Sequence, residues 1–250
     1  MSVAGRVALI SGGSRGIGAA TVRLFAAAGA KVVFTYQKAQ AEAERLVKEC
    51  GGDSCFAVQC DLDSVESASR AVQAAADRFG KLDILVANHG IWPEDDVGVD
   101  EMSADHWRKT LKINLDAVFG LVKFAVPELK KKGGHIVLVS STSGQRGEAY
   151  HIDYSASKGA IISMTKSLSS ELLKYNIRVN CLAPGWVETD MSAATLAKPD
   201  AGAQIRATIP MGRVGKPEEI AGPILFLCTE HAGFVSGEIF NVNGGAVLVG

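Results

Sequence analysis

The sequence predicts an α/β fold: a single-domain, Rossmann-type, doubly wound parallel sheet of seven strands with helices on both faces. Seven short apolar runs alternate with longer stretches of helical periodicity, and a glycine-rich turn follows the first run. Of the 250 residues, 47% are hydrophobic and 21% are charged, which provides enough apolar material for a sizeable core. Residues 1–250 are therefore expected to form one domain.

The expected strands are short runs rich in β-branched residues. Such runs are apolar throughout, because a parallel sheet covered by helices is buried on both faces. The runs are Val7–Ser11, Lys31–Thr35, Cys55–Gln59, Asp83–Ala87, His135–Ser140, Arg178–Ala183 and Ile239–Val242.

The expected helices lie between these strands. They are Ile17–Ala28, Ala39–Cys50, Ser64–Phe79, Ala104–Lys131, Tyr154–Tyr175 and Pro217–Cys228. Right-handed crossovers then make a doubly wound sheet the economical topology. A closed barrel of eight strand–helix units is the alternative, but seven strands and a phosphate-binding motif after the first one favour the open sheet.

The stretch Trp186–Met211 interrupts the alternation of strands and helices. It is a long segment without strand periodicity, directly before the last expected helix. Long connections of this kind often act as active-site lids. We therefore expect a loop that forms a substrate lid over about 186–211.

Composition excludes several classes of protein. Lys and Arg number 26 against 27 Asp and Glu, so no basic surplus attracts nucleic acid or an anionic membrane. The first apolar stretch, Val7–Ile10, is too short for a signal peptide or a membrane span. The five cysteines include no C-x-x-C pair, which favours a reduced, cytoplasmic protein without a metal site.

A glycine-rich turn, Ser11–Gly18, joins the first strand to the first helix. Glycines let the backbone approach a pyrophosphate, and the helix N-terminus offers free N–H groups and the positive end of its dipole. A tight connection alone would explain the glycines, but their place after the first strand favours dinucleotide binding. The candidate binding residues here are Gly12, Ser14, Arg15, Gly16, Ile17 and Gly18.

The end of the second strand bears on the choice of dinucleotide. An acidic residue about 20 residues after the turn usually binds the ribose 2′-hydroxyl of NAD. Here the segment reads Thr35-Tyr36-Gln37-Lys38 and holds no carboxylate. Lys38 and Arg15 could instead pair with a 2′-phosphate, and we therefore expect NADP rather than NAD.

Tyr154 and Lys158 stand four residues apart in a predicted helix and share one face. A cation about 4 Å from the phenol would lower its pKa by up to about 3 units, toward the range of a general acid/base. Ser141 follows an expected strand, where its hydroxyl could bond a substrate carbonyl. Asn114, inside a long helix, could hold a water that relays protons. Taken singly, Tyr154 and Lys158 could be a surface pair, Ser141 an ordinary turn residue and Asn114 a solvent-facing amide. Their joint occurrence behind a glycine turn favours an enzyme.

These residues resemble the short-chain dehydrogenase/reductase family. The similarity extends from about Gly5 to Gly245. It is carried by Gly12-x-x-x-Gly16-Ile17-Gly18, Asp61, Asn88 with Gly90, Asn114, Ser141, Tyr154-x-x-x-Lys158, Asn180 with Pro184-Gly185, Thr189 and Asn241-Val242-Asn243-Gly244-Gly245.

The resemblance implies roles for these residues. Tyr154 would be the general acid/base and Ser141 would orient the carbonyl. Lys158 would bind the nicotinamide ribose and lower the pKa of Tyr154, while Asn114 would support a water relay. The other cofactor contacts would come from Tyr36, Lys38, Asp61, Leu62, Asn88, Gly90, Pro184, Gly185, Val187 and Thr189. His89 departs from the family pattern, which has alanine there, and a hydrogen-bonded packing histidine is the preferred interpretation.

The reaction implied is hydride transfer between NADP and a ketone or secondary alcohol. Within the family the chain most resembles 3-oxoacyl-[acyl-carrier-protein] reductases, which implies a thioester of acyl-carrier protein or CoA. Lys130, Lys131, Lys132 and Lys174 could form a docking patch, or could simply cap helices. The acidic stretch Glu94–Glu101, if it borders the pocket, would instead favour a neutral ketone or a sugar.

Several alternatives stay open. The chain could be an NAD(P)-linked sugar, alcohol or small-ketone dehydrogenase, a dinucleotide-sensing binding protein, or a structural interaction protein. The expected partner is a small molecule, with neither nucleic acid nor membrane. The resemblance also implies a homotetramer, built through the helices Ala104–Lys131 and Tyr154–Tyr175 and the C-terminal segment.

Overall fold

The computed structural model describes residues 1–249, which form one seven-stranded sheet. Every neighbouring pair of strands is parallel, and the strand order is β3-β2-β1-β4-β5-β6-β7. The strands are β1 (Val7–Ile10), β2 (Lys31–Tyr36), β3 (Cys55–Gln59), β4 (Ile84–Ala87), β5 (Gly134–Val139), β6 (Ile177–Pro184) and β7 (Ile239–Val242). The predicted doubly wound, Rossmann-type fold is confirmed.

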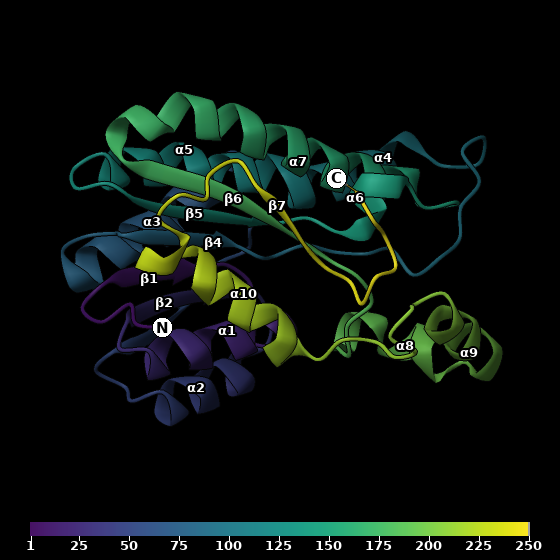
Figure 1. Cartoon of the computed structure of the whole chain (residues 1–250), viewed down its shortest axis with the longest axis horizontal. Coiled ribbons are helices and arrows are strands. Elements are labelled where there is room, and N and C mark those ends of the chain that lie inside the picture. The colour runs from purple at the N-terminus through teal and green to yellow at the C-terminus, as the bar shows by residue number, and fades with distance from the viewer. Residues whose placement is uncertain (250) are drawn as a thin grey trace.

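Helices cover both faces of this sheet. They are α1 (Gly16–Ala27), α2 (Gln40–Glu49), α3 (Val65–Phe79), α4 (Ala104–Leu111), α5 (Ala117–Leu129), α6 (Thr142–Arg146), α7 (Ile152–Leu172), α8 (Asp190–Ala197), α9 (Pro199–Ala207) and α10 (Pro217–Leu227). One core cluster joins the sheet to α1, α2 and α10, and a second joins it to α3, α5 and α7. Figure 1 shows these two layers on opposite sides of the strands. Because both faces are covered, every residue of β1 and β4 is buried.

The stretch predicted as one helix, Ala104–Lys131, is interrupted. A π-helical turn over Lys112–Asp116 separates α4 from α5. It carries Asn114, whose exposed fraction is 0%. The alternative in which Asn114 faces solvent is therefore wrong, and π turns of this kind often occur at functional sites.

The segment 186–211 was expected to be a loop, but it contains α8 and α9. Thr189 and Ser192 form a capping box at the start of α8, and Pro199 occupies the first turn of α9, where a missing N–H costs nothing. Helices this short leave little periodicity in a sequence. In Figure 1 they stand apart from the sheet, beyond α10.

The order of strands reverses at β1, which lies between β2 and β4. In doubly wound sheets such a switch point opens a crevice at the carboxyl ends of the strands. Ser11, Asn88 and Ser141 follow β1, β4 and β5, so all three lie along this edge.

No helix within residues 1–249 combines the length and the apolarity needed to cross a bilayer.

Candidate active site

Hydrogen bonds join the carboxyl ends of β1 and β4. The Ser11 hydroxyl oxygen accepts bonds from the backbone N–H groups of Asn88 (3.0 Å) and His89 (3.2 Å). The Asn88 side-chain amide donates to the carbonyls of Ser11 (3.1 Å) and Gly12 (3.3 Å). The predicted cofactor residue Asn88 therefore holds the glycine turn in place.

The N-terminus of α1 presents backbone donors to the crevice. The first bond of the helix runs from the Ala19 N–H to the Arg15 carbonyl at 3.1 Å, and the N–H groups of Gly16–Gly18 precede it. Gly18 packs tightly, since a Cβ there would lie 2.0 Å from the Gly12 carbonyl oxygen. The turn thus has the free backbone donors that a diphosphate requires, and its binding role stays a prediction.

A hollow of about 560 Å³ lies beside the ends of β2 and β3. Its lining includes the cations Lys38 and Arg70 and the carboxylate of Asp61. The Gln37 side-chain amide donates to Asp61 at 2.8 Å. The structure therefore brings Lys38 and Asp61 together, and it adds Arg70, which the sequence alone did not single out because it lies on α3.

Arg15 does not line this hollow and instead pairs with Asp190, with the two charged groups 3.4 Å apart. Both side chains are about two-thirds exposed, and an exposed pair of this kind contributes at most about 1 kcal/mol. Tyr36 ends β2 half-buried, and Leu62 is buried just after β3. Arg15 and Lys38 therefore do not converge as expected.

The segment after β6 faces the glycine turn across the crevice. A Cβ on Gly16 would lie 3.2 Å from the Thr189 methyl group. Val187 is buried and held by an isolated β-bridge to Gly215. The predicted cofactor residues on this side of the crevice are Pro184, Gly185, Val187 and Thr189.

Tyr154 and Lys158 lie on α7, as predicted. Lys158 is buried, and its ammonium donates a hydrogen bond to the Val139 carbonyl at 2.9 Å. A Cβ on Gly90 would lie 3.4 Å from Nζ, so the predicted residue Gly90 gives this ammonium room. The ammonium is 5.8 Å from the centre of the Tyr154 ring.

Burial dominates the pKa values of this pair. It raises the pKa of Tyr154 to about 12, while a hydrogen bond with Ser141 lowers that pKa and the charge of Glu148 raises it. Burial lowers the pKa of Lys158 to about 8. The expectation that Lys158 brings the pKa of Tyr154 down is therefore wrong in this structure, because the ammonium is directed to Val139.

Ser141 caps the N-terminus of α6. Its hydroxyl oxygen accepts a hydrogen bond from the Ser143 N–H at 3.1 Å. Gly144 lets α6 lie directly against α7, since a Cβ there would be 2.5 Å from the Lys158 carbonyl carbon. The α6–α7 packing places Ser141 near Tyr154, where its hydroxyl lowers the pKa of the phenol.

The Asn114 side chain clamps the segment after β4. Its Oδ1 accepts from the Ile91 N–H at 2.8 Å, and its Nδ2 donates to the Ile91 carbonyl at 2.9 Å and to the Ser157 hydroxyl at 3.3 Å. The structure thus gives Asn114 a positioning contact, and the water relay stays a prediction.

His89 links the glycine turn to the π turn. Its Nδ1 accepts from the Ser11 hydroxyl at 2.8 Å, and its Nε2 donates to the Ile113 carbonyl at 3.1 Å. Burial, together with the positive charge of Lys158, lowers the pKa of His89 to about 4, so the ring is neutral at pH 7. The interpretation as a hydrogen-bonded packing histidine is confirmed.

An aromatic wall stands beside the N-terminus of α7. The centre of the Trp92 ring is 4.8 Å from that of His151 and 5.7 Å, edge to face, from that of Trp186. The His151 imidazole also contacts the Asp96 carboxylate at 3.2 Å. The acidic stretch Glu94–Glu101 therefore borders this wall through Asp96.

The segment between α6 and α7 carries a further carboxylate. Glu148 is half-buried and accepts a hydrogen bond from the Ser143 hydroxyl. The same segment is tied to the acidic stretch, because the Val97 N–H donates to the Tyr150 carbonyl at 3.3 Å. Sequence reasoning missed Glu148, since nothing local distinguishes it from a solvated turn residue.

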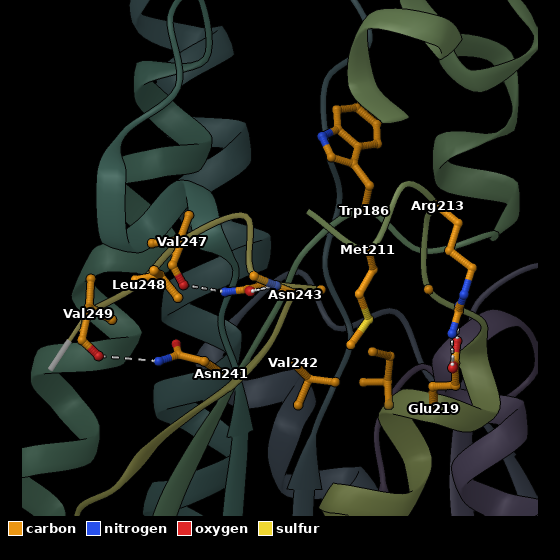
Figure 2. A pocket seen from close by; sticks show the side chains of 14 residues that line it. Trp186, Met211, Arg213, Glu219, Asn241, Val242, Asn243, Val247, Leu248 and Val249 are labelled. Carbon is orange, nitrogen blue, oxygen red and sulfur yellow. Dashed lines mark hydrogen bonds and ion pairs between the residues drawn. The ribbon is translucent and has the colours of Figure 1, made fainter. Parts of the chain in front are cut away.

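A second cavity of about 760 Å³ lies between the segment after β6 and the C-terminal residues. Figure 2 shows Trp186 and Met211 on one side of it and Val247–Val249 on the other. Arg213 and Glu219 form an ion pair at its edge, with 2.7 Å between the charged atoms. Trp186 belongs to both this cavity and the aromatic wall.

The lysines considered as a docking patch lie elsewhere. Lys130 and Lys174 follow the ends of α5 and α7, just before β5 and β6 begin, and stand 4.2 Å and 5.2 Å from the centre of the Tyr175 ring. They are thus at the amino edge of the sheet, opposite Ser141 and Tyr154. The expected patch does not border the site of the same chain.

Comparison with known proteins matches the part of the chain that holds this site. A family model described as enoyl-(acyl carrier protein) reductase matches residues 12–247, which include all the candidate residues. A 3-oxoacyl-[acyl-carrier-protein] reductase of Synechocystis sp. is 37% identical over 248 residues, which cover 97% of each chain.

Two solved structures from Brucella melitensis share the fold. One is described as a short-chain dehydrogenase/reductase and glucose/ribitol dehydrogenase; it has a TM-score of 0.92 and 36% identity, with 100% of both chains covered. The other is a 3-ketoacyl-(acyl-carrier-protein) reductase complexed with NADH, with a TM-score of 0.91 and 33% identity over 99% of this chain and 100% of that one.

Proposed function

Since the chain belongs to the short-chain dehydrogenase/reductase family and is a nicotinamide-dependent oxidoreductase, we propose that it prefers NADP and interconverts a ketone and a secondary alcohol. The observation that carries the proposal is the convergence of Ser141, Tyr154 and Lys158 at the carboxyl edge of the sheet, beside the glycine turn.

Proton transfer falls to Tyr154. When bound, the cofactor supplies or accepts the hydride. A pKa near 12 keeps the Tyr154 hydroxyl protonated at neutral pH, so it can donate a proton to the carbonyl oxygen during reduction. The Ser141 oxygen accepts the Ser143 N–H, which leaves the Ser141 O–H able to donate to the same carbonyl. The Lys158 ammonium has three N–H donors, of which one bonds the Val139 carbonyl; the other two could bond the nicotinamide ribose.

The preference for NADP rests on the hollow beside β2 and β3. Lys38 and Arg70 line it, and the position after Thr35 is Tyr36 rather than an acid. Two cations outnumber the one carboxylate of the hollow, Asp61, which accepts a hydrogen bond from Gln37, and this balance suits a 2′-phosphate.

Two substrate classes follow from different observations. The name of the Synechocystis relative favours a 3-oxoacyl thioester of acyl-carrier protein or CoA. The acidic stretch that reaches the aromatic wall through Asp96 would repel a polyanionic thioester and favours a sugar, an alcohol or a small ketone. The name of the first Brucella structure points the same way.

Further properties are proposed with this function. We infer a cytoplasmic location, which agrees with five unpaired cysteines, four of them buried. We also infer a homotetramer through α5, α7 and the C-terminal segment. The segment 186–211, which contains α8 and α9, would act as a lid, because its Trp186 belongs to both the aromatic wall and the second cavity.

A kinetic panel tests the proposal. Acetoacetyl thioesters, cyclic ketones and sugars are assayed with NADPH and with NADH. We expect NADPH to be used at least about tenfold more efficiently, since a hydrogen bond to a charged group contributes about 1.5–3 kcal/mol. Lys38→Ala should raise the KM for NADPH about tenfold and leave the KM for NADH unchanged. Lys48→Ala, an exposed lysine on α2, is the control. Equal use of both cofactors would contradict the NADP preference.

A further inference from the structure

Glu148 lies in the segment that joins α6, which Ser141 caps, to α7, which carries Tyr154, and the proton transfer does not use its carboxylate. It accepts a hydrogen bond from Ser143, which lies two residues after Ser141 at the start of α6. Gly144 of α6 packs directly against Lys158 of α7, which brings the start of α6 beside the α7 turn that carries Tyr154. The negative charge of Glu148 also raises the pKa of Tyr154.

This carboxylate retains unused capacity to accept hydrogen bonds. An ionised carboxylate has about four acceptor sites, and the Ser143 hydroxyl occupies one of them. Glu148 is half-buried, so the protein has removed part of its hydration. A ligand that donates hydrogen bonds would replace what burial removes.

The segment that carries Glu148 is fixed rather than free. Gly147 has a φ of 78° and Tyr150 a φ of 66°, a conformation that non-glycine residues rarely adopt. The Val97 N–H holds the Tyr150 carbonyl at 3.3 Å, and the Glu148 carbonyl accepts from the His151 N–H at 3.3 Å. The carboxylate is therefore presented at a defined place.

The neighbouring surface is aromatic and acidic. Trp92 lies against His151 and Trp186, and Asp96 pairs with His151. Aromatic faces contact the C–H groups of a substrate, while a few placed polar groups fix its orientation. The negative charge of Glu148 and Asp96 disfavours phosphates and carboxylates in the ligand.

We propose that Glu148 is a specificity-determining residue that accepts a hydrogen bond from a substrate hydroxyl adjacent to the reacting carbon, so that the enzyme acts on a hydroxyketone, a sugar or a polyol. The inference rests on the proposed function and decides between its two substrate classes.

The reaction balances without a proton transfer by Glu148. In reduction, hydride from NADPH adds to the carbonyl carbon, the Tyr154 proton moves to the carbonyl oxygen, and the C=O π bond becomes an O–H bond. The products are NADP and a diol, and solvent returns the proton to Tyr154. Glu148 stays ionised throughout and holds the neighbouring hydroxyl.

Matched substrates test this assignment in the full-length enzyme. Cyclohexanone and 2-hydroxycyclohexanone are reduced with NADPH, and cyclohexanol and 1,2-cyclohexanediol are oxidised with NADP. We expect the wild type to prefer the hydroxylated member of each pair by at least about tenfold in kcat/KM. Glu148→Gln should lower kcat/KM for the hydroxylated substrates about tenfold more than for the unsubstituted ones, mainly through KM. Glu171→Gln, an exposed glutamate at the far end of α7, should change neither.

The outcomes separate this inference from the proposed function. Equal use of both members of a pair by the wild type would overturn the inference without any variant, so the test does not depend on Glu148→Gln folding. A preference for 2-aminocyclohexanone over 2-hydroxycyclohexanone would show that Glu148 binds a cation rather than a hydroxyl, and would also overturn the inference. Better turnover of acetoacetyl thioester than of hydroxyketone would overturn it while the proposed function stands. No turnover of any ketone with either cofactor would overturn the proposed function itself.

Discussion

The cofactor side and the substrate side of this site are built in different ways. On the cofactor side, the glycine turn is a continuous segment, and Ser11 and Asn88 bind it at adjacent strand ends. On the substrate side, segments more than 90 residues apart in sequence meet through the contact of Trp92 with Trp186. The cofactor side can therefore be recognised in the sequence as a local pattern, whereas the substrate side is assembled from distant segments when the chain folds.

The contrast explains what each side contributes. Helix N-termini and tight turns bind a diphosphate through backbone groups, which depend little on side-chain identity. The proposed substrate contacts come from individual side chains such as Glu148 and Asp96, and such side chains differ freely among proteins with one fold. The reaction type thus follows from the first side and the substrate from the second.

The largest expected effect lies where the two sides meet, at Tyr154. Tyr154→Phe removes the proton donor but keeps the ring, so we expect kcat to fall about 10²- to 10⁴-fold. Affinity for NADPH should change little, because the glycine turn is untouched; fluorescence titration of the bound cofactor measures it. Ketone reduction at the wild-type rate would contradict the assigned proton donor, and loss of NADPH binding would contradict the separation of the two sides.

The difference also explains how much could be predicted. Each strand was predicted within one residue at either end, because buried parallel strands are continuous apolar runs. Ser141, Tyr154 and Lys158 were found from a strand end and a helical spacing. Glu148 was missed, because its importance comes from Ser143 and Tyr154 rather than from its own neighbours in sequence.

Two errors have a common physical origin. The pKa of Tyr154 was expected to fall, but burial raises it to about 12, and burial cannot be read from one sequence position. The π turn at Asn114 was expected to be ordinary helix, because one extra residue in a turn leaves the apolar pattern almost unchanged. Each error concerns an environment rather than a residue type.

An intermediate effect is expected at His89, which bonds to both the glycine turn and the π turn. His89→Asn removes the ring that bonds the Ser11 hydroxyl on one side and the Ile113 carbonyl on the other. A buried polar group left without a partner lowers the free energy of unfolding by about 1–3 kcal/mol. The midpoint of urea unfolding at fixed protein concentration should therefore fall.

The same variant changes the pH dependence of stability. The pKa of His89 is lowered from 6.5 to about 4, so the unfolded chain binds a proton more readily than the folded one. The contribution of neutral His89 to the free energy of unfolding is complete above about pH 6.5 and is lost as the pH falls toward 4. The free energy of unfolding changes there by at most about 1.4 kcal/mol per pH unit. His89→Asn should flatten this slope between pH 6.5 and 4, whereas His231→Asn, at an exposed position, should leave it intact. An unchanged slope in His89→Asn would show that the ring titrates normally.

The smallest effect sharpens the comparison on the substrate side, through the pH profile of Glu148→Gln. Oxidation of an alcohol requires the Tyr154 phenolate, so its rate rises with pH toward the pKa of that group. The Glu148 charge raises this pKa, and its removal stabilises the phenolate. The profile for cyclohexanol, which has no second hydroxyl, should therefore move to lower pH in Glu148→Gln and stay in place in Glu171→Gln. Because this substrate offers nothing for Glu148 to bind, the shift reports the electrostatic contact alone. A profile that does not move would place the carboxylate too far from Tyr154 to contact the same substrate.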